Sequence, residues 1–288
     1  MKCINFDKEF RLYLQNWMKK NSRKYRNIRE MEAAMPEVYR EFLETPADFL
    51  GSLCPGRYFD QWQDAKVLVN WMEDYFKQRV PVPDVLLNRI AALGMDSEKA
   101  LMAVLLRDRS PAEAKMCAMS LLTEIGSAAP MQLFIEMQKD RSEDDELADK
   151  AIEGLHAMGS EAADEMRKAI FLCNDSGKEA LLSLLCDFGC DDALFALSME
   201  LLGAHPDRAA VLADYISRLG DERAVRPLID LARSEETGYL DYIELRSAIE
   251  KLGGDAPERQ FDESDPAYNA LRALDRSGDP ADPDEVKP

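Results

Sequence analysis

The side chains best suited to catalysis or metal binding are six cysteines and two histidines. The cysteines are Cys3, Cys54, Cys117, Cys173, Cys186 and Cys190, and no two of them form a CxxC motif. Cys186 and Cys190 lie four residues apart, so they would share one face of a helix. A structural zinc site needs four such ligands, and His156 and His205 are not spaced to complete one. We therefore predict reduced thiols and neither a metal nor another cofactor.

Other common reactions would leave a motif that this sequence lacks. Neither GxxxxGK[ST] nor GxGxxG occurs, so no phosphate-binding loop is predicted. The hydrolase motifs GxSxG and HExxH are also missing. The acidic run at 143–146 lacks the alternating oxygen ligands and central glycine of an EF-hand loop. We interpret that run as carboxylates at a helix N-terminus, and we expect no enzyme.

Composition restricts the classes of partner. The chain has 288 residues, of which 46% are hydrophobic, enough to bury one large core or two ordinary ones. It carries 36 Lys+Arg against 55 Asp+Glu, a net charge of -19 that repels phosphate backbones and anionic lipid surfaces. No apolar run has the length of a signal peptide or a membrane span. We predict a cytoplasmic protein that binds neither nucleic acid nor membranes.

A repeat of about thirty residues organises the elements that would position a site. Six glycines each end an amphipathic stretch, at Gly94, Gly126, Gly159, Gly189, Gly220 and Gly253. The residues one, four and eight positions before every glycine are apolar. Those offsets fall on one side of a helix, so each unit is predicted to end in a helix with a buried stripe. Glycine then tolerates the left-handed backbone that ends the helix.

A second amphipathic run follows five of these glycines. The runs cover residues 96–107, 128–139, 161–172, 191–202 and 221–233. Each unit therefore reads helix, turn, helix. Because one pair cannot cover both of its apolar faces, neighbouring pairs must stack, which predicts an all-α fold, an α-solenoid over residues 81–253.

One unit carries a recognisable string. The run Gly220-Asp-Glu-Arg-Ala-Val-Arg-Pro-Leu-Ile-Asp-Leu-Ala-Arg233 resembles the short HEAT-like repeat of phycobilisome (bilin) lyases, whose units combine glycine, an acidic residue, Arg or Lys, Ala-Val, Pro-Leu and a later Leu. The other units keep the glycine and the apolar skeleton but lose the Arg-Ala-Val-x-Pro string. The resemblance covers about residues 83–253 and implies a scaffold, without any chemistry of its own.

Enzymes built on related solenoids give the alternative function. Deoxyhypusine hydroxylases bind iron through His-Glu pairs, but here His156 precedes Ala157 and His205 precedes Pro206. Alkylpurine DNA glycosylases use a basic, aromatic-lined groove, whereas the residues six before each glycine are small polar or acidic. An enzyme of the bilin-lyase or glycosylase kind stays the alternative.

We predict a noncatalytic protein-interaction or scaffold module. In HEAT-like solenoids the second helix of each pair faces the concave side, and there we expect a polar and acidic surface for a basic or polar protein or peptide. We call its residues the inner row: Asn88, Ser120, Asp149, Glu153, Ser183, Asp187, Asp214, Ser247 and Glu250.

The two ends differ from the middle. Residues 1–80 contain all three tryptophans and are predicted to form an N-terminal helical cap, with a capping box at 45–48. Its basic patch is either a docking point for an acidic partner or RNA, or a solvated helix end that pairs with the protein's own acidic surface: Lys19, Lys20, Arg23, Lys24, Arg26 and Arg29. Residues 254–288 are acidic, Pro-rich and predicted to be partly disordered, with a short helix from Pro266 that caps the last repeat or lies in the groove.

Overall fold

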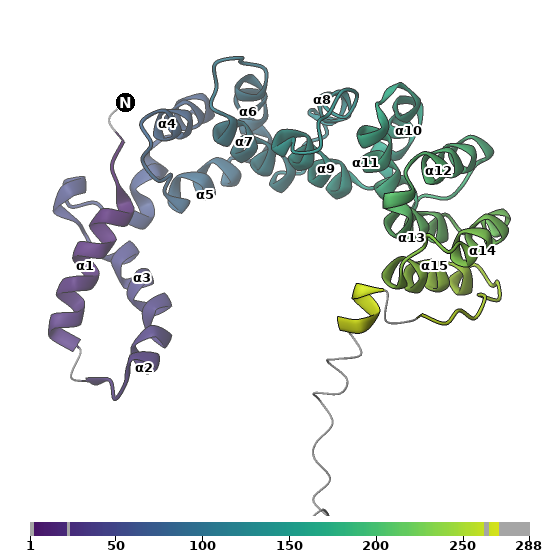
Figure 1. The fold of residues 1–288 in the computed structure, drawn as a ribbon. Helices are drawn as coiled ribbons and strands as arrows, with labels where there is room; N and C mark the ends of the chain where they lie inside the picture. Colours follow the sequence, from purple (N-terminus) through teal and green to yellow (C-terminus); the bar gives the residue numbers. More distant parts are fainter. Residues whose placement is uncertain (1–2, 22–23, 262–264, 271–288) are drawn as a thin grey trace, which may run out of the picture. The chain divides into compact units, whose positions relative to one another are not determined.

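The computed structural model describes residues 3–21, 24–261 and 265–270. Within these ranges every regular element is an α-helix or a short 3-10 helix (Figure 1). One isolated bridge joins Ala47 to Leu53. The predicted all-α class is confirmed. The chain divides into two compact units. Unit 1 comprises residues 1–137 and 144–159, and unit 2 comprises residues 138–143 and 160–288.

Unit 1 begins with short helices and 3-10 turns and continues as helix pairs. The elements are α1 (Phe6–Asn21), α2 (Ile28–Ala33), α3 (Met35–Glu44), η2 (Asp48–Leu50), η3 (Pro55–Gln61), α4 (Ala65–Lys77), α5 (Asp84–Ala92), η4 (Gly94–Ser97), α6 (Glu98–Leu105), α7 (Ala112–Glu124), α8 (Met131–Glu136) and α9 (Glu146–Met158). The pairs are α4 with α5, α6 with α7 and α8 with α9. Their second helices also pack in chain order, α5 on α7 and α7 on α9 (Figure 1).

Unit 2 repeats the pairing. Its elements are α10 (Ser160–Ala169), η5 (Ile170–Leu172), α11 (Asp175–Leu185), α12 (Asp192–Ala204), η6 (Pro206–Arg208), α13 (Ala209–Leu219), η7 (Glu222–Ala224), α14 (Val225–Arg233) and α15 (Tyr239–Lys251). Helix α10 packs on α11, α12 on α13 and α14 on α15. The second helices α11, α13 and α15 pack successively as well (Figure 1).

The predicted apolar stripe is the core of both units. The twelve residues four and eight positions before the six glycines are at most 1% exposed. All six glycines have a positive φ, between 57° and 88°. Both predictions are confirmed. The residues one position before the glycine follow less closely: Leu219 and Leu252 are buried, whereas Leu93 and its three counterparts are half-buried because they lie in the last turn, beside the open connection.

Two local predictions were wrong. The run predicted over 128–139 yields only α8, which starts after Pro130 and ends at Glu136, because Ala128 and Ala129 form a turn ahead of the proline. The capping box at 45–48 does not form. The Thr45 hydroxyl donates to the Glu41 carbonyl at the end of α3 (2.6 Å), and a 3-10 turn starts at Asp48 instead.

The segment 138–143 belongs to unit 2 because it is held by the start of α11. The Asn174 side chain caps α11 through Gly177 N and donates to the Arg141 carbonyl (2.8 Å). The Asn174 amide donates to the Lys139 carbonyl (2.8 Å). A Cβ atom on Gly177 would lie 1.9 Å from the Gln138 carbonyl oxygen. Glycine is therefore required where the segment crosses α11.

The described part of the C-terminal segment packs against the last helix pair. Arg259 donates to the carbonyls of Ser234 and its neighbours at the end of α14, and its guanidinium lies over the Phe261 ring. Asp265 accepts from the amide of Tyr239 at the start of α15 (2.7 Å) and from the amides of a short helix over 266–270. The C-terminal segment is predicted either to cap the last repeat or to lie in the groove. The contacts of its described part are those of a cap on α14 and α15.

Candidate functional site

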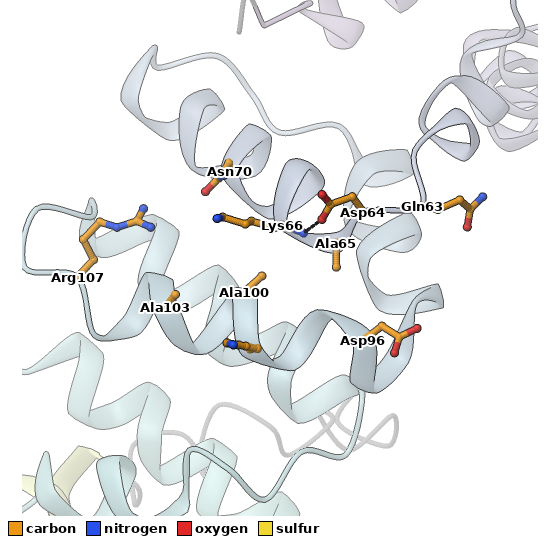
Figure 2. Close-up of a pocket in the computed structure, with 10 residues that line it drawn as sticks. Gln63, Asp64, Ala65, Lys66, Asn70, Asp96, Ala100, Ala103 and Arg107 are labelled. Carbon is orange, nitrogen blue, oxygen red and sulfur yellow. Dashed lines mark hydrogen bonds between the residues drawn. The ribbon is translucent and has the colours of Figure 1, made fainter.

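A polar groove in unit 1 is the strongest candidate site. It has a volume of about 550 Å³ and lies between α4 and α6 (Figure 2). We call it the α4–α6 groove, and its lining residues are Gln63, Asp64, Ala65, Lys66, Asn70, Asp96, Lys99, Ala100, Ala103 and Arg107. Pockets that hold ligands commonly have volumes of about 300–1,000 Å³. The groove is thus large enough to bind more than solvent.

Amphipathic patterning puts these side chains in the groove. Helix α4 buries Leu68 and Met72 in the core, so Lys66 and Asn70 are exposed on its other side. Positions 96, 99 and 103 are three or four residues apart and form one stripe along η4 and α6, and Arg107 follows two residues after α6 ends. The small side chains of Ala100 and Ala103 leave space between the two helices (Figure 2). The same periodicity that builds the core therefore opens the groove.

The two ends of the groove differ in charge. Asp64 and Asp96 lie at one end, where α4 and η4 begin, and Arg107 lies at the other, with Lys66 pointing toward Asn70 (Figure 2). The Asp64 carboxylate caps α4 by accepting from Lys66 N (2.9 Å). Negative charge at a helix N-terminus is stabilised by the helix dipole. The positions of Asp64 and Asp96 near the starts of helices account for these two carboxylates. The same reason does not account for Lys66 and Lys99.

Arg107 is fixed by a buried carboxylate. Glu73 on α4 is 2% exposed; it pairs with Arg107 and Lys77 and accepts from the Ser110 hydroxyl (2.8 Å). Burial raises the pKa of Glu73, but the hydrogen bonds from Lys77, Ser110 and Arg107 outweigh it, so the pKa lies below its usual value. This cluster joins α4 to the loop before α7 and keeps Arg107 at the groove's end.

Lys66 and Lys99 are both exposed, and no described residue forms an ion pair with either ammonium group. Asn70 likewise has an exposed amide without a protein partner in the described ranges. Gln63 is held differently, because its Oε1 accepts from Arg89 Nη2 (2.7 Å). The middle of the groove therefore offers two cations and an amide to an external ligand.

The structure divides the predicted inner row between the two units. Unit 1 contains Asn88, Ser120, Asp149 and Glu153, all exposed on α5, α7 and α9. Glu153 pairs with Lys150 on its own helix. Unit 2 contains Ser183, Asp187, Asp214, Ser247 and Glu250 on or just after α11, α13 and α15. No inner-row residue lines the α4–α6 groove.

In unit 2 two of the inner-row acids, Asp187 and Asp214, have cationic partners on the next helix. Asp187 accepts from Arg218 Nε (2.9 Å), and Asp214 accepts from Lys251 Nζ (3.0 Å). Arg218 also lies 3.8 Å from Asp214, and Glu250 pairs with Arg246 at 2.8 Å. Acid and base thus alternate from α11 to α13 to α15. We call Asp187, Arg218, Asp214 and Lys251 the charge ladder; it satisfies these carboxylates within the chain.

The basic patch lies at the end of α1 and around α2. Lys19, Lys20, Lys24, Arg26 and Arg29 are exposed, and Arg23 lies outside the described residues. None of the five described side chains forms an ion pair with a carboxylate in the described part of the chain. Ile28 beside them is 69% exposed, and Trp17 packs on Tyr25 with ring centroids 5.6 Å apart.

The cysteines and histidines form no site. None of the six cysteines forms a disulfide, and the described residues contain no group of three His, Cys, Asp or Glu side chains able to hold a metal ion. Burial raises the pKa of Cys117 to about 11 and that of Cys186 to about 12. His205 lies 3.1 Å from Asp175, and His156 is exposed on α9.

The sequence analysis did not identify Lys66, Lys99 or Arg107. One signal was present: Asp96, Lys99, Ala103 and Arg107 are three or four residues apart in the sequence and do not coincide with the buried positions Leu101 and Val104 of α6. That spacing alone does not show which helix faces the stripe.

No helix in the described ranges has both the length and the apolar character needed to cross a bilayer. Comparisons with protein-family models, curated proteins and solved structures gave no match.

Proposed function

We propose that this chain is a noncatalytic protein-interaction module, a HEAT-like α-solenoid whose α4–α6 groove receives a segment of a partner protein. The observation that carries the proposal is the groove itself. Two helices that start at the same end line it, and Lys66, Lys99 and Asn70 present hydrogen-bond donors there that the described part of the chain does not use (Figure 2).

The order of helix contacts supports the solenoid part of the proposal. A solenoid requires each pair to pack on its neighbours in the chain. In unit 1 the second helices do so from α5 to α9, and in unit 2 they do so from α11 to α15. The string that resembles bilin-lyase repeats fits this scheme, because Ala224 and Leu228 are buried and Pro227 lies in the first turn of α14, where its missing N–H costs little.

The groove's side chains favour binding over catalysis. No Ser, Thr, Cys or His lines it, so it contains no hydroxyl or thiol nucleophile and no imidazole base. No aromatic ring lines it either, so it offers no surface on which a base or sugar would stack. A segment laid between α4 and α6 would instead contact both helices along their length.

Filling the groove tests the proposal. Ala103 is an exposed alanine of the groove, and Ala196 is an exposed alanine in the middle of α12. Ala103→Trp should abolish capture of specific proteins from the lysate of the source cells, measured by mass spectrometry, while Ala196→Trp should leave it unchanged. Capture of the same proteins by both variants would reject the groove as the binding site.

A further inference from the structure

The cations of the α4–α6 groove and its acids are in different electrostatic situations. Asp64 is the N-cap of α4 and its carboxylate accepts from the Lys66 main-chain amide (2.9 Å), and Asp96 lies in the turn η4 that leads into α6. Lys66 and Lys99 are the second residues of α4 and α6, where the helix dipole does not favour a cation, and neither ammonium group has an ion-pair partner among the described residues. Arg107 adds a third cation, of which Glu73 neutralises part. Lys66 and Lys99 are therefore the groove cations that have no ion-pair partner among the described residues.

The distribution of charge between the units points the same way. Unit 1 contains 20 Lys+Arg and 24 Asp+Glu, whereas unit 2 contains 16 and 31. Unit 1 therefore repels an anionic partner much less than unit 2 does. The inner row is predicted to attract a basic or polar partner. The cations of the α4–α6 groove instead favour an acidic partner.

The groove floor restricts the shape of the ligand. Ala100 and Ala103 let a chain approach α6 closely, and the Asn70 amide both donates and accepts, as main-chain groups require. An extended segment exposes such main-chain groups, whereas a helix has already satisfied its own. The carboxylates of an extended segment would reach the ammonium groups of Lys66 and Lys99 from above this floor.

We infer that the α4–α6 groove binds an acidic, extended segment of a partner protein, with Asp or Glu carboxylates on Lys66 and Lys99. The inference rests on the function proposed above and names the chemical class of the partner. Charge-assisted hydrogen bonds between ammonium and carboxylate groups supply the recognition, so binding weakens as salt increases.

Three labelled peptides provide the test: alternating Glu and Ala, alternating Gln and Ala, and alternating Lys and Ala, each titrated with the full chain by fluorescence anisotropy. We expect the Glu peptide to bind most tightly. Lys66→Gln combined with Lys99→Gln should weaken it about tenfold, as expected for two exposed charge pairs. Lys19→Gln combined with Lys20→Gln changes the net charge equally and should leave the affinity within about twofold.

The outcomes separate this inference from the proposed function. Equal affinity for the Glu and Gln peptides would overturn the acidic partner, and loss of that binding in Ala103→Trp would still support the groove. Loss of the Glu peptide in the Lys19/Lys20 variant, with the Lys66/Lys99 variant unaffected, would move the acidic site to the basic patch and overturn the inference. A Glu peptide that binds Ala103→Trp as tightly as the wild type would contradict both proposals.

Discussion

Replacing Glu73 by glutamine removes the charge that holds Arg107 at the end of the groove. The carboxylate is 2% exposed and is contacted by Lys77, Arg107 and the Ser110 hydroxyl. Truncating one member of a buried ion pair usually costs about 3–5 kcal/mol. Here the two cations are 45% and 44% exposed, so water solvates them once the charge is gone.

The remaining cost is that of the weakened hydrogen bonds. A hydrogen bond to a charged group contributes about 1.5–3 kcal/mol, and the amide oxygen of Glu73→Gln still accepts from Ser110. We therefore expect the free energy of unfolding of unit 1 to fall by about 2–3 kcal/mol at neutral pH. Glu153→Gln is the control, because Glu153 is 65% exposed and pairs only within α9; it should cost less than about 0.5 kcal/mol.

Urea unfolding followed by tryptophan fluorescence is the appropriate assay, because Trp17, Trp62 and Trp71 all lie in unit 1. The pKa of Glu73 is lowered in the folded state, so its stabilisation is complete above the unfolded pKa of about 4.3 and is lost as the pH falls through the folded value. The difference between wild type and Glu73→Gln should accordingly shrink in acid. A difference that stays constant from neutral pH into acid would refute the electrostatic explanation.

The other predictions concern unit 2 and the thiols. Gly177→Ala should destabilise unit 2 by about 1–3 kcal/mol, seen as an earlier circular dichroism transition, because its methyl group meets the Gln138 carbonyl. Gly203→Ala, in an open position of α12, should be neutral or stabilise slightly, and a loss equal to that of Gly177→Ala would contradict the steric reason. Asp214→Asn should cost under about 1 kcal/mol, because its ion pair is exposed. Iodoacetamide near neutral pH should label the buried Cys186 far more slowly than Cys54, as peptide mapping would show.

The helical core could be read from the sequence because its signal is local. Leu122, Leu155 and Leu185 each lie four residues before a glycine, and each is fully buried. A helix of fixed period converts that spacing into a single buried side without knowledge of any other helix. The positive φ of Gly220 follows from the same local rule, since only glycine adopts it at low cost.

Contacts between helices could not be read in the same way. Arg107 meets Glu73 across 34 positions of chain, and Lys251 meets Asp214 across 37. The sequence shows an excess of acid at the inner row but not which base reaches it, so it does not identify Arg218 and Lys251 as the partners of Asp187 and Asp214. Likewise, the Gly177 requirement arises from the Gln138 carbonyl, which no pattern within α11 reveals.

The charge ladder and the α4–α6 groove both contain acidic and basic side chains, but only the ladder pairs them between helices along its whole length. Along α11, α13 and α15 the ladder acids Asp187 and Asp214 each meet a base of the next helix, and exposed ion pairs of this kind contribute little to stability. Between α4 and α6 the corresponding cations have no acid opposite, although the two helices pack together. In a chain with 55 acidic residues, two adjacent helices with unpaired lysines are a departure from the electrostatic pattern of unit 2. A ligand that supplies the missing carboxylates would complete in unit 1 the pairing that unit 2 makes internally.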